Sequence, residues 1–259
     1  MPPLTRPSSS PDVPVEELGE RLVRADWTVL PYCVASGSEQ MAADLELLEW
    51  ASAGQGPTLR FYGWDPPCVS IGRFQNVDSL NLAELMSRGL NWVRRPTGGR
   101  AILHDRELTY AIAVPPRILL DAGVLASYRA LSGLIERAVG SALGLPFRSR
   151  TEDSAVTEPA PLISSRGVAN CFALLAEGDS ALAEGKLIGS AQVRRDGAVL
   201  QHGSLLLSVD REAWRALFGS TGRMIALADV LDHQPSPEAL AAQLAGAWSR
   251  TLRNALGSP

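Results

Sequence analysis

The sequence predicts a single α+β domain in which helices flank a mixed, largely antiparallel sheet. Short apolar, β-prone runs recur along the chain. Hairpin signals separate several of these runs, at Glu184-Gly185 and at Arg195-Asp196-Gly197. Helical periodicity is confined to a few longer segments, of which 124–143 is the clearest. No second domain boundary is visible, so we expect one domain over 26–257, preceded by a disordered tail over 1–25.

The first half of the chain predicts a strand at 27–30 and then a helix from Ser36 to about Ala53. The residues Ser36-Gly37-Ser38-Glu39 are typical of a helix N-terminus. We expect one face of this helix to carry Met41, Ala42, Leu45 and Leu48. Further elements follow in order: strands at 58–62 and 68–71 around a Gly-Trp-Asp-Pro-Pro turn, a short helix at 81–88, and β-prone runs at 92–93, 101–103 and 108–114.

The second half begins with the helix at 124–143. The polar stretch 148–170 contains two prolines and no clear period, which predicts a long loop of the kind that often serves as a lid. Strands are expected at 180–183, 187–193 and 198–207. Helices are expected at 211–218, at 224–231 and from Ser236-Pro237-Glu238, where an N-cap precedes a proline at the first helical position.

Composition narrows the classes of partner. The 259 residues are 46% apolar and 20% charged with a net charge of −4, which gives nucleic acid no electrostatic support. There is no run of 18 apolar residues for a membrane span, and the Pro- and Ser-rich start lacks the apolar centre of a secretory signal. The three cysteines form no CxxC or Cys/His cluster, so we expect no metal, no disulfide framework and a cytoplasmic protein.

The stretch from Arg94 to Asp105 reads Arg-Arg-Pro-Thr-Gly-Gly-Arg-Ala-Ile-Leu-His-Asp. Glycines let backbone N–H groups approach a ligand closely, and two arginines supply forked donors beside the turn. Spacing alone therefore indicates a strand–turn–strand anion site. A β-turn with a solvated pair of charges explains the same residues equally well.

Cys171 and Lys186 are the residue types needed for covalent acyl transfer. A free thiol is only a few per cent thiolate at neutral pH, and a nearby ammonium lowers its pKa and stabilises an oxyanion on an attacked carbonyl. Taken alone, a cysteine is more often a small buried apolar residue and a lysine a solvated surface charge.

Two blocks of sequence resemble a known superfamily. The stretch 94–105 is similar to the RRxTGGGxVxHD signature of lipoate ligases, octanoyltransferases and biotin ligases. The stretch from Lys186 to Val193 with 200–207 resembles the GRKVAGSAQ…LQHGS block of octanoyltransferases that use a cysteine and a lysine, and the Cys171–Lys186 spacing resembles theirs. With similar residues at 59–64, 73–76 and 107–110, the resemblance covers about Trp27 to Asp210 and implies a lipoate/biotin ligase catalytic-domain-like fold.

The resemblance implies a reaction in two steps. Cys171 takes an octanoyl group from octanoyl-acyl carrier protein as a thioester, and a lysine of an apo lipoyl domain then attacks to give an amide. The acceptor would be the glycine-cleavage H protein or an E2 subunit. Lys186 would lower the thiol pKa and hold the carbonyl. No cofactor is implied, because thioester to amide is downhill.

The same resemblance implies a set of substrate-binding residues: Arg94, Gly98, Gly99, His104, Gly189, Ser190, Ala191 and His202. The glycines are also ordinary turn residues, and both histidines also suit a structural role. Asp44 is expected to orient loops, and His233 to lie on the surface. We expect an apolar slot for the acyl tail, worth roughly 5 kcal/mol at about 0.8 kcal/mol per buried CH₂.

Three other functions compete with this interpretation. An ATP-dependent lipoate-protein ligase shares the signature, but Arg100 stands where ligases show a third glycine. The stretch 106–110 also departs from the ligase pattern, and we expect no additional C-terminal domain. A non-catalytic acyl- or lipoyl-domain-binding relative would explain Asn170 and Gly185, which depart from the octanoyltransferase pattern. An amidotransferase that moves octanoyl between lipoyl domains shares the cysteine chemistry but fits the lysine and histidine blocks less well.

Overall fold

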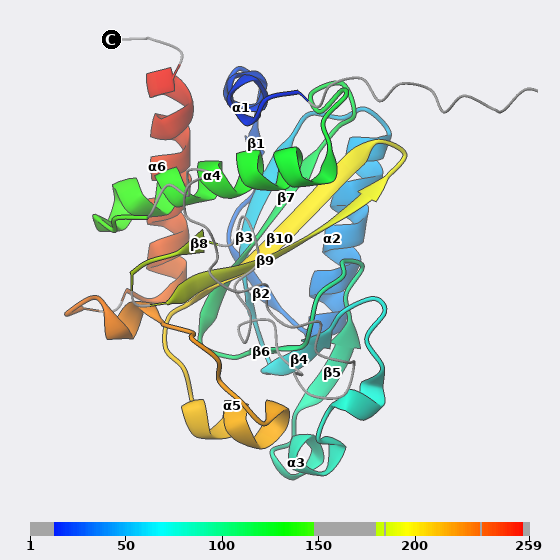
Figure 1. Cartoon of the computed structure of the whole chain (residues 1–259), viewed down its shortest axis with the longest axis vertical. Coiled ribbons are helices and arrows are strands. Elements are labelled where there is room, and N and C mark those ends of the chain that lie inside the picture. Colours follow the sequence, from blue (N-terminus) through cyan, green and yellow to red (C-terminus); the bar gives the residue numbers. More distant parts are fainter. Residues whose placement is uncertain (1–12, 148–179, 184, 234, 256–259) are drawn as a thin grey trace, which may run out of the picture.

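A seven-stranded sheet forms the centre of the protein (Figure 1). The computed structural model describes residues 13–147, 180–183, 185–233 and 235–255. Strand order is β1-β3-β7-β10-β9-β8, with β2 also paired to β3. Only β1 and β2 run parallel to their neighbour, so the predicted antiparallel character is confirmed. The strands are β1 (Thr28–Val29), β2 (Cys33–Ala35), β3 (Thr58–Trp64), β7 (Glu107–Val114), β8 (Ser180–Ala181), β9 (Lys186–Arg195) and β10 (Ala198–Leu206).

A smaller sheet of three strands lies at one end of the large one (Figure 1). Its central strand β4 (Cys68–Ile71) pairs in parallel with β5 (Asn91–Arg94) and antiparallel with β6 (Ile102–His104). The 94–105 motif therefore begins on one edge strand of the small sheet and ends after the other. The chain then enters β7 of the large sheet, so the motif lies where the two sheets meet.

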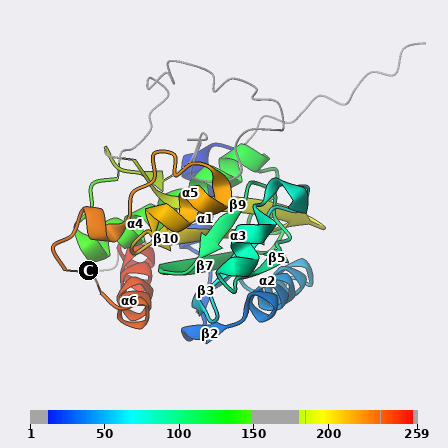
Figure 2. The same ribbon diagram turned by 90° about the horizontal axis from the view of Figure 1, so that it is seen from below.

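Helices cover both faces of the large sheet, and Figure 2 shows α2 and α4 on opposite sides of it. One core joins α1, α4 and α6 to β3, β7 and β10, and a second packs α2 against the other face. The helices are α1 (Val15–Val23), α2 (Gly37–Ser52), α3 (Leu82–Ser87), α4 (Val124–Leu143), α5 (Arg211–Phe218) and α6 (Pro237–Ala255), with 3₁₀ turns η1 (Val77–Ser79) and η2 (Leu227–Asp229). In the described part of the chain, no helix has the length and apolarity needed to cross a bilayer.

Helix α1 corrects our expectation of a tail over 1–25. Its Leu18, Leu22 and Val23 are buried in the main core against α4 and α6. The helix is amphipathic, with Glu16, Glu17 and Glu20 between the apolar positions. It has only nine residues, so its apolar face is too short to be recognised from the sequence. Residues 1–12 lie outside the described part, as does the predicted loop 148–170.

The buried face of α2 differs from the face that we predicted. Ser36 and Glu39 do cap the helix reciprocally, and Met41 and Leu48 are buried. Ala42, however, is exposed and Leu45 is only half-buried. The polar residues Gln40 and Asp44 point inward instead, because other buried polar side chains bind them. Hydrophobic periodicity could not reveal a helix that buries polar groups.

The stretch 224–231 is not the α-helix that we predicted. Met224 forms a β-bridge to Lys186, and backbone hydrogen bonds join Arg223 and Ile225 to Lys186 on both sides of it. Only η2 is helical there. Gly185 allows this pairing, because a Cβ at that position would lie 2.2 Å from the carbonyl oxygen of Arg223. The departure of Gly185 from the octanoyltransferase pattern therefore has a local structural reason.

The β9–β10 hairpin is the predicted turn at Arg195-Asp196-Gly197. Arg195 pairs with Ala198, so the loop contains only Asp196 and Gly197, whose φ angles are 50° and 79°. Two positive φ angles in a two-residue loop match the twist of the flanking strands. The register that follows sets His202 opposite Ala191 and Gly203 opposite Ser190.

Candidate acyl-binding site

A cavity lies between α2, the large sheet and the small sheet, with about 330 Å³ of space, part of which is open to solvent. Four groups of residues line it: Met41 from α2; Tyr62, Trp64 and Thr109 from β3 and β7; Ser70, Arg95, Ile102 and His104 from the small sheet and its motif; and Gly189, Ser190, Ala191, His202, Gly203 and Ser204 from β9 and β10.

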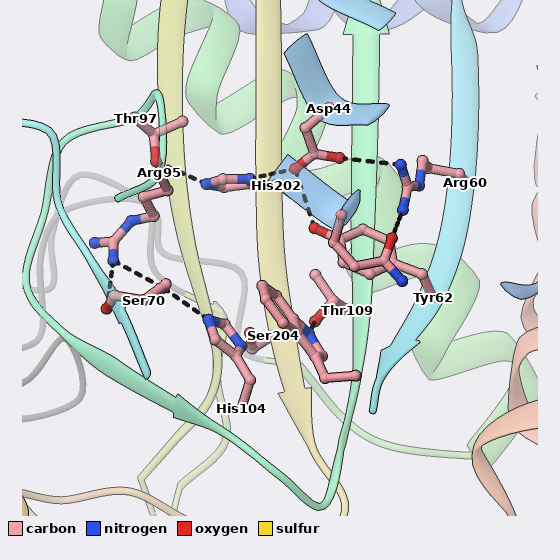
Figure 3. A network of polar contacts seen from close by, with 12 residues as sticks. Asp44, Arg60, Tyr62, Ser70, Arg95, Thr97, His104, Thr109, His202 and Ser204 are labelled. Carbon is pink, nitrogen blue, oxygen red and sulfur yellow. Dashed lines mark hydrogen bonds and ion pairs between the residues drawn. The ribbon is translucent and has the colours of Figure 1, made fainter. Parts of the chain in front are cut away.

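His202 is held at one side of this cavity by a buried carboxylate (Figure 3). Its Nδ1 is 2.8 Å from Asp44 Oδ2, and its Nε2 is 2.7 Å from the Thr97 hydroxyl. Asp44 is fully buried; its Oδ2 also accepts a hydrogen bond from the Tyr62 hydroxyl, and its Oδ1 is 3.6 Å from Arg60 Nη1. Asp44 therefore fixes the imidazole ring and balances the buried Arg60 charge, which is more than the loop-orienting role that we expected.

His104 repeats the arrangement on the opposite side (Figure 3). Its Nδ1 is 2.7 Å from Glu107 Oε1, and its Nε2 is 2.7 Å from the Ser70 hydroxyl. The hydroxyls of Thr109 and Ser204 donate to the same Glu107 oxygen. The ring also stacks on Trp64 with centroids 3.8 Å apart. A carboxylate at Nδ1 favours the tautomer with the proton on that nitrogen, so each Nε2 accepts a hydrogen bond from its hydroxyl.

The two arginines of the motif serve separate purposes. Arg95 is buried, and its guanidinium donates to the carbonyls of Gly98, Arg100 and Ser70 and to the Ser70 hydroxyl. Arg94 Nη1 instead contacts the carbonyl oxygens of Gly72, Arg73 and Gln75 on the neighbouring loop. Both side chains thus brace backbone turns. They do not form the paired anion fork that spacing suggested, and they are not solvated as a pair.

Burial also perturbs the acidity of two groups beside the cavity. Burial, together with the nearby Glu107 charge, raises the pKa of the Cys68 thiol from its usual 9.0 to about 12. Burial and the Asp44 charge raise the pKa of Tyr62 well above its usual 10. Cys68 is therefore a neutral thiol at physiological pH and not a nucleophile. Among the described residues, no three His, Cys, Asp or Glu side chains gather as metal ligands.

The structure brings together five of the expected substrate-binding residues: His104, Gly189, Ser190, Ala191 and His202. Arg94 is the last residue of β5, and Gly98 and Gly99 lie in the turn that follows; these three are not among the residues that line the cavity. Gly99 has φ of 88°, so the turn needs a glycine there. Cys171 falls outside the described residues, and His233 lies in a surface turn.

Lys186 is the first residue of β9, and the cavity is lined by residues in the middle of that strand. Lys186 is only 2% exposed, and its backbone pairs with β8 on one side and forms a bridge to Met224. Gly189 lies three positions from Lys186 and Ala191 lies five, which is about 10 Å and about 16 Å along a strand.

Sequence reasoning missed several residues that build the cavity. Thr97, Ser70 and Glu107 stood inside or beside the recognised motifs without a predicted role, and Arg95 was expected only as an anion donor. The alternation of β7 gives a partial signal, because Glu107 and Thr109 lie two residues apart and therefore share a face. The partners themselves are distant in sequence, as with Asp44 and His202.

The sequence matches a family model described as the lipoyl protein ligase A/B catalytic domain over residues 36–249. A relative named octanoyltransferase LipM from Geobacillus kaustophilus is 41% identical over 186 residues, covering 69% of this chain and 64% of that protein. Another of that name from Symbiobacterium thermophilum is 38% identical over 195 residues, covering 73% and 68%. The chain thus spans slightly less than two thirds of the Geobacillus protein.

Solved structures support the fold. A putative lipoate protein ligase from T. acidophilum aligns with a TM-score of 0.66 at 21% identity, covering 90% of this chain and 86% of that one. A lipoate-protein ligase A bound with ATP aligns with a TM-score of 0.66 at 22% identity, covering 90% and 85%. At such identities the likeness concerns the fold alone. The family-model match over most of the sequence shows that this chain belongs to the lipoyl protein ligase A/B catalytic-domain family.

Proposed function

We propose that this chain is an octanoyltransferase that passes an octanoyl group from an acyl carrier protein to a lysine of apo lipoyl domains. The observation that carries the proposal is the position of the octanoyltransferase-like block. Its central residues Gly189, Ser190 and Ala191, with His202, form one wall of the cavity. The relatives named octanoyltransferase add support from sequence.

In this proposal the acyl group lies along β9. The carbonyl lies toward Lys186, and the tail lies in the cavity along Gly189, where glycine leaves room. The expected slot was apolar, whereas this cavity also contains polar side chains. Those polar groups are hydrogen-bonded to one another, so they can face a hydrocarbon tail without losing hydrogen bonds to water.

The chemistry assigned to Cys171 and Lys186 balances without a cofactor. The Cys171 thiolate attacks the donor thioester carbonyl, and the carrier thiolate leaves as the new thioester forms. A neutral lysine amine of the lipoyl domain then attacks this thioester, loses a proton and releases the Cys171 thiolate. The Lys186 ammonium stabilises the thiolate and the oxyanion in both steps. The expected acceptors are the glycine-cleavage H protein and E2 subunits, and the expected location is the cytoplasm.

Intact-mass measurement tests this function. After mixing with octanoyl-acyl carrier protein, the wild-type chain should gain one octanoyl group, and Cys171→Ala should gain none. Cys33→Ala is the matched control and should be acylated like the wild type. Absence of an adduct on the wild type, together with no transfer to an apo lipoyl domain, contradicts the proposal. If Cys171→Ala loads lipoate with ATP, the protein is a ligase.

A further inference from the structure

Phe74 is unusually placed for an aromatic residue. Its side chain is 87% exposed, on the loop that follows β4. The guanidinium of the exposed Arg73 stacks over its ring at 5.4 Å from the centroid. Aromatic residues, phenylalanine among them, and arginine are enriched in protein–protein interfaces relative to the rest of the surface.

The loop that carries Phe74 is held rigidly. Arg94 Nη1 lies 2.7–3.1 Å from the carbonyl oxygens of Gly72, Arg73 and Gln75. The backbone N–H of Gln75 donates to Gly72 within the loop. An anchor fixed in this way loses little conformational entropy when a partner binds. The hydrogen bonds of Arg94 thus hold the exposed ring ready for a partner.

This loop also packs against the wall of the acyl-binding cavity. The Arg73 N–H donates to the Thr97 carbonyl at 2.8 Å, and a Cβ on Gly72 would lie 2.0 Å from the Gly99 carbonyl oxygen. Thr97 in turn contacts His202. A partner on Phe74 would therefore lie beside the Thr97-Gly98-Gly99 turn, whose first residue contacts the cavity residue His202.

The charge around the loop differs in sign from that of the whole chain. Residues 70–100 contain five arginines and two carboxylates, although the chain carries a net charge of −4. Among these arginines, Arg73 and Arg94 are exposed at the loop itself. A local positive field beside an exposed apolar ring favours an acidic protein surface that offers an apolar contact.

We propose that Phe74 and Arg73 form the docking anchor for the acidic carrier protein that delivers the acyl group. This inference rests on the proposed function. It favours the donor over the lipoyl-domain acceptor because of distance. The anchor adjoins the Thr97 turn, which contacts His202, and the β9 partner of His202, Ala191, lies about 16 Å along the strand from Lys186. A carrier presents its thioester on a long flexible arm and can dock that far from the reacting carbonyl. An acceptor must bring a lysine side chain directly to it.

The experiment compares two donors that differ only in the carrier. One is octanoyl-acyl carrier protein, and the other is the octanoyl thioester of free pantetheine. Phe74→Ala and Arg73→Glu should each lower kcat/KM for acylation by the carrier protein by about tenfold or more, through KM. The rate with octanoyl-pantetheine and the KM for the apo lipoyl domain should stay within about twofold of the wild type. Met86→Ala, at a 78% exposed side chain on α3, is the control and should change neither donor.

Three results would overturn the docking proposal. In the first, kcat/KM for the carrier protein is unchanged in both variants. In the second, the reactions with both donors slow equally, which would indicate a structural role for the two residues. In the third, the KM for the apo lipoyl domain rises, which would make the acceptor the occupant. The wild-type protein tests the proposed function separately, before any variant is compared. If it accepts octanoyl from neither donor, the proposed function is wrong and the docking proposal is wrong with it.

Discussion

Arg94 and Arg95 are neighbours in sequence but face opposite environments. Successive side chains at the end of a strand project to opposite sides, so Arg95 is buried at the cavity while Arg94 reaches the loop of Phe74. A sequence motif shows that both are present and not which backbone carbonyls each one binds. The motif could therefore predict the family. The different contacts of its two arginines could not be predicted without the tertiary structure.

Other residues of the site show the same boundary between what could and could not be predicted. Gly189 to Ala191 and both cavity histidines were predicted because they stand in recognisable blocks. The Asp44–His202 bond joins residues that are 158 positions apart, and nothing in local periodicity marks such a pair. Buried polar networks depend on complementary partners from several elements, which only the tertiary structure brings together.

Asp44 supports the first prediction. Asp44→Asn keeps the shape of the side chain but removes the charge that balances buried Arg60. An uncompensated buried charge costs about 3 kcal/mol or more, so the free energy of unfolding should fall by that amount in urea denaturation. Glu49→Gln, in the exposed pair with Arg195, is the matched control and should cost less than about 1 kcal/mol. Equal losses in the two variants would show that the Asp44 charge stabilises the fold no more than an exposed ion pair does.

Cys33 and Cys68 should differ in reactivity. In a Cys171→Ala background only these two thiols remain. Cys33 is exposed, whereas Cys68 is buried with a pKa raised to about 12. Titration of the folded protein with a thiol reagent at pH 8 should therefore label one thiol per chain, and titration in denaturant should label two. Labelling of both thiols without denaturant would contradict the burial of Cys68.

At the scale of elements, most helices and strands could be predicted and the exceptions share a cause. Helix α4 and helix α5 have the predicted bounds because their apolar positions repeat with helical period. The stretch 224–231 also has apolar residues at helical spacing, but Met224 pairs with Lys186 at the sheet edge. There the backbone hydrogen bonds offered by an existing strand outweigh local propensity.

Helix α1 gives a prediction for an element that the sequence did not reveal. Leu22→Ala should lower the free energy of unfolding by about 2–5 kcal/mol, because Leu22 is fully buried in the main core. Chemical denaturation followed by circular dichroism measures this loss. Glu20→Ala, on the exposed side of the same helix, should change stability by less than about 0.5 kcal/mol. If both changes had similarly small effects, α1 would not be packed in the core, and the predicted tail over 1–25 would be correct.

At the scale of the whole molecule, the cavity lies where two sheets meet. Its walls combine strands from both sheets with one side chain of α2, so no single segment could form it. The fold class was predictable because hairpins and periodic helices are local signals. The existence of a separate three-stranded sheet was not, because the pairing of β4 with β5 joins segments that are separated by a helix.

Stability of the folded molecule should decrease in alkali. The raised pKa values of Cys68 and Tyr62 mean that the folded state keeps both groups neutral while the unfolded chain ionises them near pH 9 and 10. The contribution of Cys68 is complete below about pH 9 and is lost as the pH rises toward 12, and that of Tyr62 is complete below about pH 10 and falls above it, at up to about 1.4 kcal/mol per pH unit for each group. Urea unfolding at pH 8 and pH 10.5 measures the difference. Cys68→Ala should show a smaller decrease, and an equal decrease would exclude Cys68 as a source.

The two-residue loop of the β9–β10 hairpin limits how this protein can change in length during evolution. Insertion or loss of one residue between that loop and the cavity would turn β10 over. The side chains of His202 and Ser204 would then turn away from the cavity, and that of Gln201 would turn toward it. Substitutions that keep a positive φ at the loop leave the cavity intact. Descendants of this sequence should therefore tolerate changes of residue in the hairpin far more readily than changes in its length.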